Sequence, residues 1–253
     1  MSGDFYETDH ALAEYLLFHY GTADQTLPYG FGPGTALDFP VRCVAECHAT
    51  RPLPPRSRAL DLGCAVGRAS FELARHCVEV LGIDSSRRFI AAASCLRDTG
   101  LLDFAFAEEG DLKTATRAIV PPEIDRARVS FEPGDAHKLR PDLGSFDIVL
   151  MANLLDRLRA PQLCLRRLPD LLKPGGQLVI TSPCTWMIEY TPRENWLGGF
   201  ERNGQRVKTL DTLQRILAPD FHFSFRKDLP FLIREHARKF QWNVAEASVW
   251  IRK

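Results

Sequence analysis

The 253-residue sequence is short of several features that would assign it to a common class. Its formal net charge is zero, which argues against a broad surface for nucleic acid or an anionic membrane. It has no uninterrupted apolar run of membrane-spanning length, and its first residues do not begin a signal peptide. The seven cysteines form no CxxC pair, and Cys43 and Cys47 alone would make a poor metal site. We therefore expect a cytoplasmic protein with reduced, mostly buried cysteines, no metal ion, and no nucleic-acid or membrane partner.

A complete dinucleotide-binding fingerprint is also missing. Residues 58–85 predict a strand, a glycine loop, a helix and a second strand that ends at Asp84. The loop reads D-x-G-x-x-x-G from Asp61 to Gly67, whereas a dinucleotide site wants G-x-G-x-x-G. Asp61 would repel a pyrophosphate but would suit the ammonium group of an amino acid. Gly63 lacks a Cβ and lets the backbone approach a ligand, and Asp84 can accept hydrogen bonds from both hydroxyls of a ribose.

Strand-like and helix-like stretches alternate along the rest of the chain, which predicts a parallel α/β sheet. Further strands are expected at residues 129–132, 146–152, 177–182, 221–225 and 239–251, and further helices at 9–20, 38–48, 86–97, 162–172 and 209–217. Residues 101–128 are too long for a simple connection and are interpreted as an inserted hairpin or an edge extension. The last two strands are expected to form an antiparallel hairpin, with residues 229–238 between them.

Polar residues stand at the ends of four of the expected strands. They are Asp61 with Gly63, then Asp84, Asp135 and Asn153. Ligands of open α/β sheets bind at the carboxyl ends of the strands. These residues therefore predict one binding site at that edge of the sheet.

The core, residues 58–182, resembles class I S-adenosylmethionine-dependent methyltransferases. The resemblance implies a Rossmann-like α/β fold, with a seven-stranded, mostly parallel sheet, an antiparallel last strand and helices on both faces. It also implies that the loop glycines and Cys64 lie against the methionine part of S-adenosylmethionine, that Asp84 binds the ribose, and that Asp135 and the backbone of Ala136 take the adenine amino group. The full set expected around the cofactor is Asp61, Gly63, Cys64, Gly67, Asp84, Ser85, Asp135, Ala136 and Asn153. An ordinary α/β domain with a glycine turn and a nicotinamide dehydrogenase are the alternatives for this core.

Four motifs that flank the core are longer and chemically more unusual. They are YETDHALAEYLLFHYG, ALDFPVRC, YTPRENWLGG and PFLIREHARKFQW. Together they resemble the C-terminal methyltransferase part of ovothiol synthase, the 5-thiohistidine (4-mercaptohistidine) N-methyltransferase. The resemblance covers nearly the whole chain and implies methyl transfer to an imidazole ring nitrogen, the last step of ovothiol A biosynthesis.

That family is commonly fused behind an iron-dependent sulfoxide synthase, and this sequence contains no such domain. We expect a single methyltransferase domain over residues 1–253, with a helical cap at 1–55, the cofactor-binding core at 56–182, and a substrate loop and C-terminal hairpin at 183–253. The chain is then either a stand-alone enzyme, with a separate sulfoxide synthase as a possible partner, or a piece of a longer protein.

An amino-acid acceptor also needs partners for its carboxylate, its ammonium group and its ring. Candidates are Arg234 and Arg238 for the carboxylate, Glu189 for the ammonium group, and Trp186, Tyr190 and Trp196 as walls for the ring and the sulfonium cation. Asn153 and Tyr190 are the candidates for positioning the reactants. The competing interpretations are solvated charge on a strand connection for the arginines and packing of the cap for the tryptophans.

No general base is assigned. Methyl transfer is an in-line displacement, and methylation of a ring that carries a thiolate leaves a neutral product, so a strong base is not required. The alternatives for the whole protein are a methyltransferase for another small amine or phenol, and a non-catalytic cofactor-binding module that partners a sulfoxide synthase.

Overall fold

The computed structural model describes residues 5–47 and 53–253, and seven of its strands form one sheet in the order β10-β11-β7-β6-β1-β2-β5. The central strands are β1 (Arg58–Leu62), β2 (Glu79–Asp84), β5 (Val129–Pro133), β6 (Phe146–Ala152) and β7 (Leu172–Ser182), which pair in parallel. The last strand, β11 (Lys239–Arg252), pairs antiparallel with both β7 and β10 (Phe221–His236). The expected seven-stranded sheet with an antiparallel last strand is confirmed.

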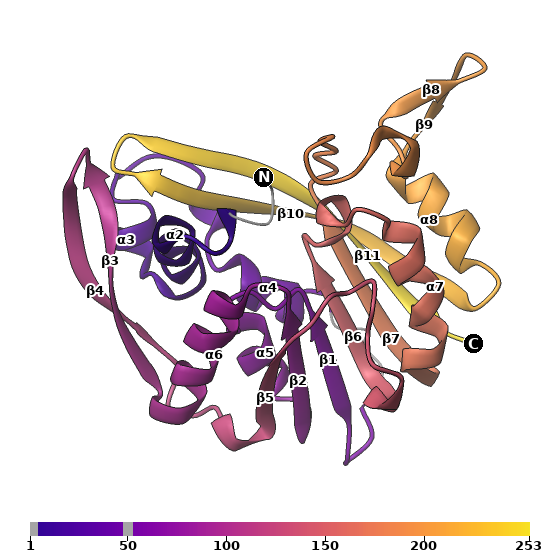
Figure 1. Ribbon diagram of the computed structural model, residues 1–253, viewed down its shortest axis with the longest axis horizontal. Helices are drawn as coiled ribbons and strands as arrows, with labels where there is room; N and C mark the ends of the chain where they lie inside the picture. Colours follow the sequence, from indigo (N-terminus) through magenta and orange to yellow (C-terminus); the bar gives the residue numbers. More distant parts are fainter. Residues whose placement is uncertain (1–4, 48–52) are drawn as a thin grey trace.

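Helices cover both faces of this sheet (Figure 1). On one face lie α2 (Asp9–Tyr20), α4 (Phe39–Ala45), α5 (Arg68–Leu73) and α6 (Arg87–Thr99), and on the other lie α7 (Pro161–Leu171) and α8 (Thr209–Leu217). Successive residues of a strand point to opposite faces, so Ala59 joins the first cluster of buried side chains and Leu60 the second. Both residues are fully buried, as expected for central parallel strands.

Several predicted boundaries shift in the structure. The second helix begins after Asp38, which has a φ of +55° and makes no side-chain cap, and it ends at Ala45. The predicted end near residue 48 lies outside the described residues. Lys173 to Gly176, expected as a turn, form a bulged start of β7, since pairing with β6 slips between Phe146 and Ile148.

The predicted connection at residues 229–238 is wrong, because β10 continues to His236. This extension leaves the main sheet with β11 and covers α2 (Figure 1). Phe231 holds it there, with its ring 4.9 Å from the ring of Phe39 and 6.0 Å from that of Phe18. Pro230 is tolerated because β10 is the edge strand and needs no second ladder partner.

Residues 101–128 form an inserted hairpin, which was one of the two predictions for this segment; the other was an edge extension of the main sheet. Strands β3 (Leu101–Glu109) and β4 (Leu112–Ile119) form a separate two-stranded sheet that packs on α2 and on the β10–β11 extension. A second small hairpin, β8 (Phe200–Arg202) and β9 (Gln205–Val207), projects from the opposite side and was not predicted. The remaining short elements are α3 (Ala23–Thr26) and the 3₁₀ helices η1 (Gly34–Ala36), η2 (Arg126–Arg128), η3 (Pro141–Leu143), η4 (Leu155–Arg157) and η5 (Arg193–Asn195).

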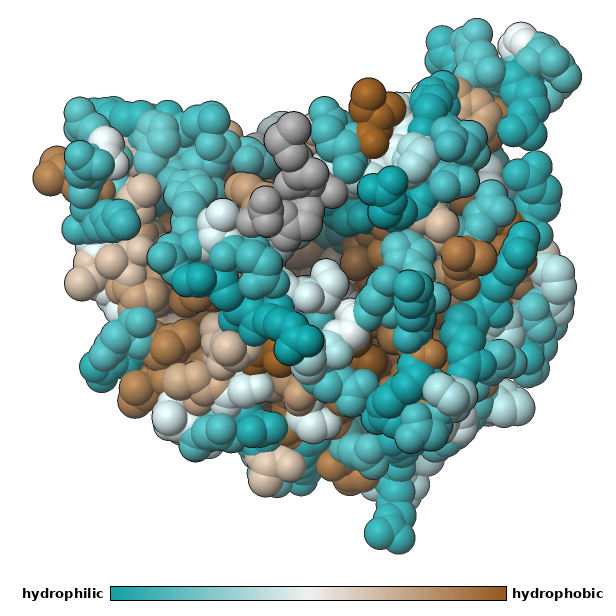
Figure 2. Space-filling view, viewed as in Figure 1, coloured by the Kyte–Doolittle hydropathy of each residue, from teal (hydrophilic) through white to brown (hydrophobic). Residues whose placement is uncertain are grey.

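The surface in this view is hydrophilic along its upper rim, and hydrophobic residues gather lower down, over the region of α6 and the base of the β3–β4 hairpin (Figure 2). Across the described residues, no helix is long and apolar enough to cross a membrane. Five of the seven cysteines are buried and all are free thiols, which agrees with the predicted burial.

Candidate active site

The carboxyl ends of β1, β2 and β6 meet at one edge of the sheet. Asp61 lies beside Gly82 in the ladder, and the chain leaves β1 through Gly63, whose N–H donates to Ile83 O at 2.7 Å. β6 pairs on the other side of β1 and ends next to Asn153. The predicted convergence of Asp61, Asp84 and Asn153 at one edge is therefore present.

The loop after β1 is held in an unusual backbone conformation. Gly63, Ala65 and Gly67 have φ values of +78°, +47° and +85°. A Cβ on Gly67 would stand 2.6 Å from Cζ of Phe131, so glycine is required there on two counts. At Gly63 the space is taken by the side chain of Leu154, 3.0 Å from an ideal Cβ, so this glycine makes room for a protein side chain as well as for the turn.

Asp84 is fixed by the loop that it faces. Its Oδ2 accepts a hydrogen bond from Ala65 N at 2.9 Å, and its Oδ1 accepts one from Ser86 N at 2.8 Å. Burial raises the pKa of this carboxyl above its usual range, and the backbone donors lower it. Each oxygen keeps a further lone pair, so the carboxylate can accept two hydroxyl groups of a ribose without moving.

Asp61 carries an unpartnered oxygen. The residue is 1% exposed, its Oδ2 accepts from Ser70 Oγ at 2.6 Å, and its Oδ1 has no partner within residues 5–47 and 53–253. Burial raises the pKa of Asp61 to about 7, and the nearby Asp84 adds to the shift. A buried carboxylate without a counter-ion is costly. The arrangement fits a cation such as the ammonium group of a methionine moiety.

Cys64 faces the protein interior rather than a ligand. It is 2% exposed, and its Sγ stands only 3.0 Å from where a Cβ on Gly82 would be. Burial, together with the charges of Asp61 and Asp84, raises the pKa of the Cys64 thiol well above its usual range. The side chain is therefore a neutral packing group. The backbone of Cys64 is also paired, because its N–H donates to Ile83 O at 3.1 Å and its carbonyl accepts from Gly67 N at 2.9 Å.

The residues after β5 continue the same edge. Gly134 N donates to Asp84 O at 2.9 Å, which places Asp135 and the buried Ala136 next to the end of β2. Asp135 Oδ1 accepts from His137 N at 2.9 Å and lies 2.7 Å from His137 Nδ1, and both Asp135 and Ser85 are exposed residues. This geometry is compatible with the adenine role expected of Asp135.

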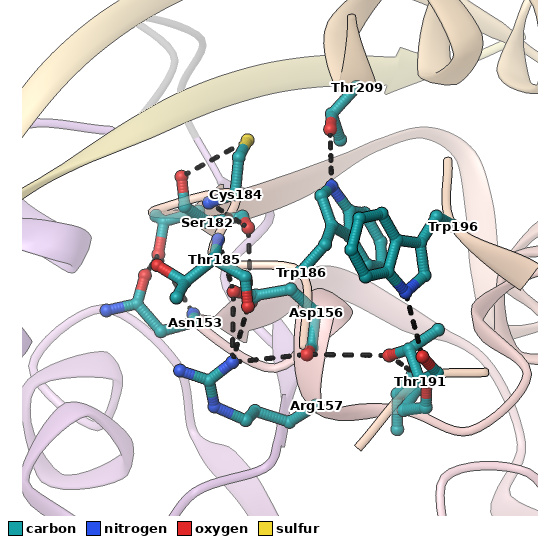
Figure 3. A network of polar contacts seen from close by, with 12 residues as sticks. Asn153, Asp156, Arg157, Ser182, Cys184, Thr185, Trp186, Thr191, Trp196 and Thr209 are labelled. Atoms are coloured by element: carbon teal, nitrogen blue, oxygen red, sulfur yellow. Dashed lines mark hydrogen bonds and ion pairs between the residues drawn. The ribbon is translucent and has the colours of Figure 1, made fainter. Parts of the chain in front are cut away.

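Asn153 adopts a left-handed conformation, with a φ of +52°. Its N–H donates to Thr181 O at 2.9 Å and its Oδ1 accepts from Thr181 Oγ1 at 2.9 Å. The carbonyl end of the amide is thus fixed, and Figure 3 shows the amide nitrogen at the free end of the side chain. Asn153 can donate from this nitrogen to a ligand at the strand ends.

Two charged residues that the sequence analysis missed lie beside Asn153 (Figure 3). Asp156 is fully buried and accepts from Ser182 Oγ at 3.1 Å, Thr185 N at 2.9 Å and Arg157 Nη1 at 3.2 Å. Burial raises the pKa of Asp156 above its usual range, although the Arg157 charge opposes the shift. The available signal was an Asp-Arg pair inside an apolar turn directly after a strand end.

The N-terminal segment closes over the loop. Tyr20 Oη donates to Val66 O at 2.9 Å, and Tyr6 O accepts from Ser86 Oγ at 2.9 Å. His19, next to Tyr20, is held neutral because burial lowers its pKa to about 3. Tyr6 and Tyr20 were not predicted in the site, because nothing local in the sequence links them to the strand ends.

The predicted aromatic walls pack mainly against each other. Trp186 is 8% exposed and its Nε1 donates to Thr209 Oγ1 at 2.9 Å, while Trp196 Nε1 donates to Thr191 O at 2.8 Å. The two indole rings stack at 6.3 Å and fasten residues 183–200 to α8 (Figure 3). Glu189, expected to bind an ammonium group, is exposed.

The structure does not bring Arg234 and Arg238 to the strand ends. Arg234 is 4% exposed, donates to Gln25 O at 2.5 Å and forms an ion pair with Glu108. It therefore holds the β3–β4 hairpin against β10, and it is neither solvated nor on a strand connection. Arg238 is exposed at the hairpin tip, 5.8 Å from the ring of Tyr29. Within the described residues, no cluster of three metal-ligating side chains occurs.

The sheet order and the strand-end carboxylates define a methyltransferase fold of class I. Residues 54–218 match the family model described as a methyltransferase domain, so the chain belongs to that family. Its members use S-adenosylmethionine, and the unpartnered Asp61 Oδ1 and the fixed Asp84 fit the ammonium and ribose groups of that cofactor.

Similar proteins carry the same domain on different chains. Phosphoethanolamine N-methyltransferase 3 of Arabidopsis thaliana is 27% identical over 155 residues, which are 61% of this chain and 26% of that protein. A probable cobalt-precorrin-6B C(15)-methyltransferase of Methanothermobacter thermautotrophicus is 30% identical over 60% of this chain and 62% of its own length. A ubiquinone biosynthesis O-methyltransferase of Coxiella burnetii is 28% identical over 49% of this chain and 42% of its own. The chain thus spans less than two thirds of each of these relatives.

Two solved structures share the fold over almost the whole chain. The [4+2]-cyclase SpnF has a TM-score of 0.60 and 20% identity, and the match covers 99% of this chain and 95% of that one. The N-methyltransferase NodS of Bradyrhizobium japonicum WM9, solved with S-adenosyl-L-homocysteine, has a TM-score of 0.51 and 17% identity, and the match covers 95% and 98%. At these identities the likeness shows the fold alone.

Proposed function

We propose that this protein transfers the methyl group of S-adenosylmethionine to an imidazole ring nitrogen of 5-thiohistidine, the last step of ovothiol A biosynthesis. The observation that supports it is the way the four flanking motifs meet in space. The first and third lie together over the strand ends, with the rings of Tyr6 and Tyr190 6.4 Å apart. The second and fourth pack behind them through Phe39 and Phe231.

For this reaction the protein must align the cofactor with the acceptor, and it does not need to activate either of them. S-adenosylmethionine supplies the methyl group on its sulfonium centre. Asp61 and Asp84 would hold its ammonium and ribose groups, which fixes the cofactor before the acceptor binds. A ring that bears a thiolate becomes neutral on methylation, so the ring nitrogen needs no strong base. His19, which stays neutral at pH 7, adds no charge to the site.

A site for a thiolate or carboxylate must also offer hydrogen-bond donors. The Asn153 amide nitrogen, the Tyr190 hydroxyl and the Arg157 guanidinium supply them at the strand ends. Plain histidine lacks the thiolate and would leave a donor unpaired, which costs binding energy. The proposal therefore predicts poor methylation of histidine.

Two other functions remain as alternatives. Relatives named as N- and O-methyltransferases show that this domain serves acceptors of different chemistry, which supports a methyltransferase for another small amine or phenol. The second alternative is a non-catalytic cofactor-binding module that partners a sulfoxide synthase. A solved cyclase shares this fold, so the fold by itself does not determine which reaction a protein catalyses.

The test is an acceptor panel with mass detection. The purified protein and S-adenosylmethionine are incubated with 5-thiohistidine, histidine, phosphoethanolamine and a catechol, and an Asp84→Ala variant serves as the control. We expect a product one methyl heavier from 5-thiohistidine, little from histidine, and much less product from the variant than from the wild type at the same concentration of S-adenosylmethionine. Methylation of another acceptor alone would support the first alternative, and cofactor binding without any product would support the second.

A further inference from the structure

Arg157 presents an unoccupied pair of parallel N–H donors at the strand ends. Among residues 5–47 and 53–253, its Nη1 makes all the hydrogen bonds of the guanidinium, to Asp156 O at 3.2 Å, Asp156 Oδ2 at 3.2 Å and Thr185 O at 3.1 Å. Nε and Nη2 have no partner in the part of the chain that the structure describes, and Figure 3 shows both directed away from these contacts. In an arginine these two nitrogens form the side-on fork that matches the two oxygens of a carboxylate.

The fork is also accessible and held in one plane. The Arg157 side chain is 26% exposed, whereas the unpaired Nε of Arg234 is buried. The centre of the Arg157 guanidinium lies 4.7 Å from the centroid of the Tyr190 ring, and buried Asp156 holds its far edge. A fixed, charged fork loses little entropy when it binds a planar anion.

Three tyrosine rings gather next to this guanidinium. The Tyr6 ring lies 5.9 Å from the Tyr15 ring and 6.4 Å from the Tyr190 ring, centroid to centroid, and the Tyr190 ring lies against Arg157. Burial is the main reason that the pKa of Tyr6 is raised to about 12. The phenolic hydroxyl of Tyr190 is a further hydrogen-bond donor that comes with the ring beside Arg157.

We infer that Arg157, with the Tyr190 hydroxyl, binds the α-carboxylate of an amino-acid acceptor. The inference rests on the proposed function, and it gives the carboxylate a partner that Arg234 and Arg238 do not provide. A planar oxyanion fits the Nε and Nη2 fork better than a thiolate does, because a single sulfur cannot accept two parallel N–H bonds with good geometry. The position beside Asn153 lets the carboxylate bind while the ring of the same acceptor reaches the strand ends.

The test compares 5-thiohistidine with its decarboxylated counterpart, the thiolated histamine, as acceptors. Arg157→Lys keeps the charge and can still contact Asp156 but loses the fork. We expect it to raise KM for 5-thiohistidine about 10- to 100-fold and to leave KM for the amine within about twofold. Tyr190→Phe, which keeps the ring under the guanidinium, should raise KM for the acid by a smaller factor.

Two controls separate this site from misfolding. Arg159→Lys changes an exposed arginine two residues away and should alter neither KM. Affinity for S-adenosylmethionine, measured by calorimetry, should be the same in Arg157→Lys as in the wild type, since the variant leaves Asp61 and Asp84 intact. A variant that binds the cofactor normally is folded.

The outcomes distinguish the two proposals. Equal effects of Arg157→Lys on both acceptors, or a wild type that does not prefer the acid, would overturn the carboxylate site while leaving the methyl transfer to thiohistidine in place. Methylation of neither acceptor by the wild type would overturn the proposed function and the carboxylate site with it. Selective loss on the acid alone supports both.

Discussion

Replacing Asp61 by asparagine should stabilise the fold and weaken cofactor binding at the same time. The carboxyl is 1% exposed, and its Oδ1 has no partner in the described residues. Burial raises its pKa to about 7, from an ordinary value of 3.8. Without a bound cation, ionised Asp61 is an unpaired charge inside the protein, and Asp61→Asn removes that charge with almost no change of shape.

The stability effect has a definite sign. Because the pKa is higher in the folded protein, the stability that this group contributes is fully present below pH 3.8 and is lost as the pH rises through 7. At pH 8 we therefore expect Asp61→Asn to raise the free energy of unfolding by about 1–3 kcal/mol. Each kcal/mol corresponds to roughly 2–4 °C in Tm for a domain of this size. Below about pH 3.8, where the wild-type carboxyl is protonated in both the folded and the unfolded protein, the two proteins should unfold at similar temperatures.

The cofactor effect runs the other way. With a pKa of about 7, the ionised fraction of Asp61 rises from about one tenth at pH 6 to about one half at pH 7. An α-ammonium group, with a pKa of roughly 7.7–8.0, stays charged over that interval. Affinity of the wild type for S-adenosylmethionine should therefore increase about fivefold between pH 6 and pH 7, and the variant should lack this increase and bind about 10- to 100-fold more weakly at pH 7.

Calorimetric titration at the two pH values and thermal unfolding of the ligand-free proteins measure both effects. A variant that binds the cofactor as tightly as the wild type would remove Asp61 from the site. A variant that is less stable than the wild type at pH 8 would show that Asp61 already has a partner in the folded protein.

Three further predictions concern the same edge of the sheet. Asp84→Ala should weaken S-adenosylmethionine binding by about 2–4 kcal/mol through the loss of two charged hydrogen bonds, and unchanged affinity in a folded variant would contradict the ribose assignment. Gly67→Ala should lower the free energy of unfolding in urea by about 2–4 kcal/mol, since the new Cβ would lie 2.6 Å from Phe131 at a residue with positive φ. The control is Gly110→Ala, which is also at positive φ but in open space and should lower it by only about 1–2 kcal/mol. Equal losses in the two variants would refute the clash with Phe131. Tyr20→Phe removes the hydrogen bond from Tyr20 Oη to Val66 O in the glycine loop. It should lower the free energy of unfolding by about 0.5–1.5 kcal/mol and weaken cofactor binding a few-fold. An affinity equal to that of the wild type would show that the N-terminal cap does not support the loop.

Local signals predicted much of the fold. The helix Asp9–Tyr20, the strand Phe146–Ala152 and the helix Thr209–Leu217 have the predicted bounds, because caps, glycine stops and apolar runs act within a few residues. The extension of β10 was missed because Pro230 and the charged residues after it do not suggest a strand. Pairing with β11 and the packing of Phe231 on helices far away in the sequence create it.

The site also contains residues that local sequence predicts and residues that it does not. Asp61 and Asp84 could be predicted because they follow apolar strands at the spacing of a βαβ unit. Asp156 and Arg157 could not, because their role comes from hydrogen bonds to Ser182 and Thr185, which the fold brings to them. Arg234 and Arg238, which were predicted to bind an acceptor carboxylate, lie away from the strand ends because β10 extends beyond the main sheet to His236.

The most direct measurement of the proposed reaction uses S-adenosylmethionine labelled with ¹³C in its methyl group. The protein is incubated with this cofactor and 5-thiohistidine, and the product is examined by NMR for correlations between the labelled methyl group and the ring carbons. We expect a methyl group on an imidazole nitrogen and almost no transfer to histidine. A methyl group on the sulfur or the α-amine, or no labelled product from a protein that binds the cofactor, would contradict it.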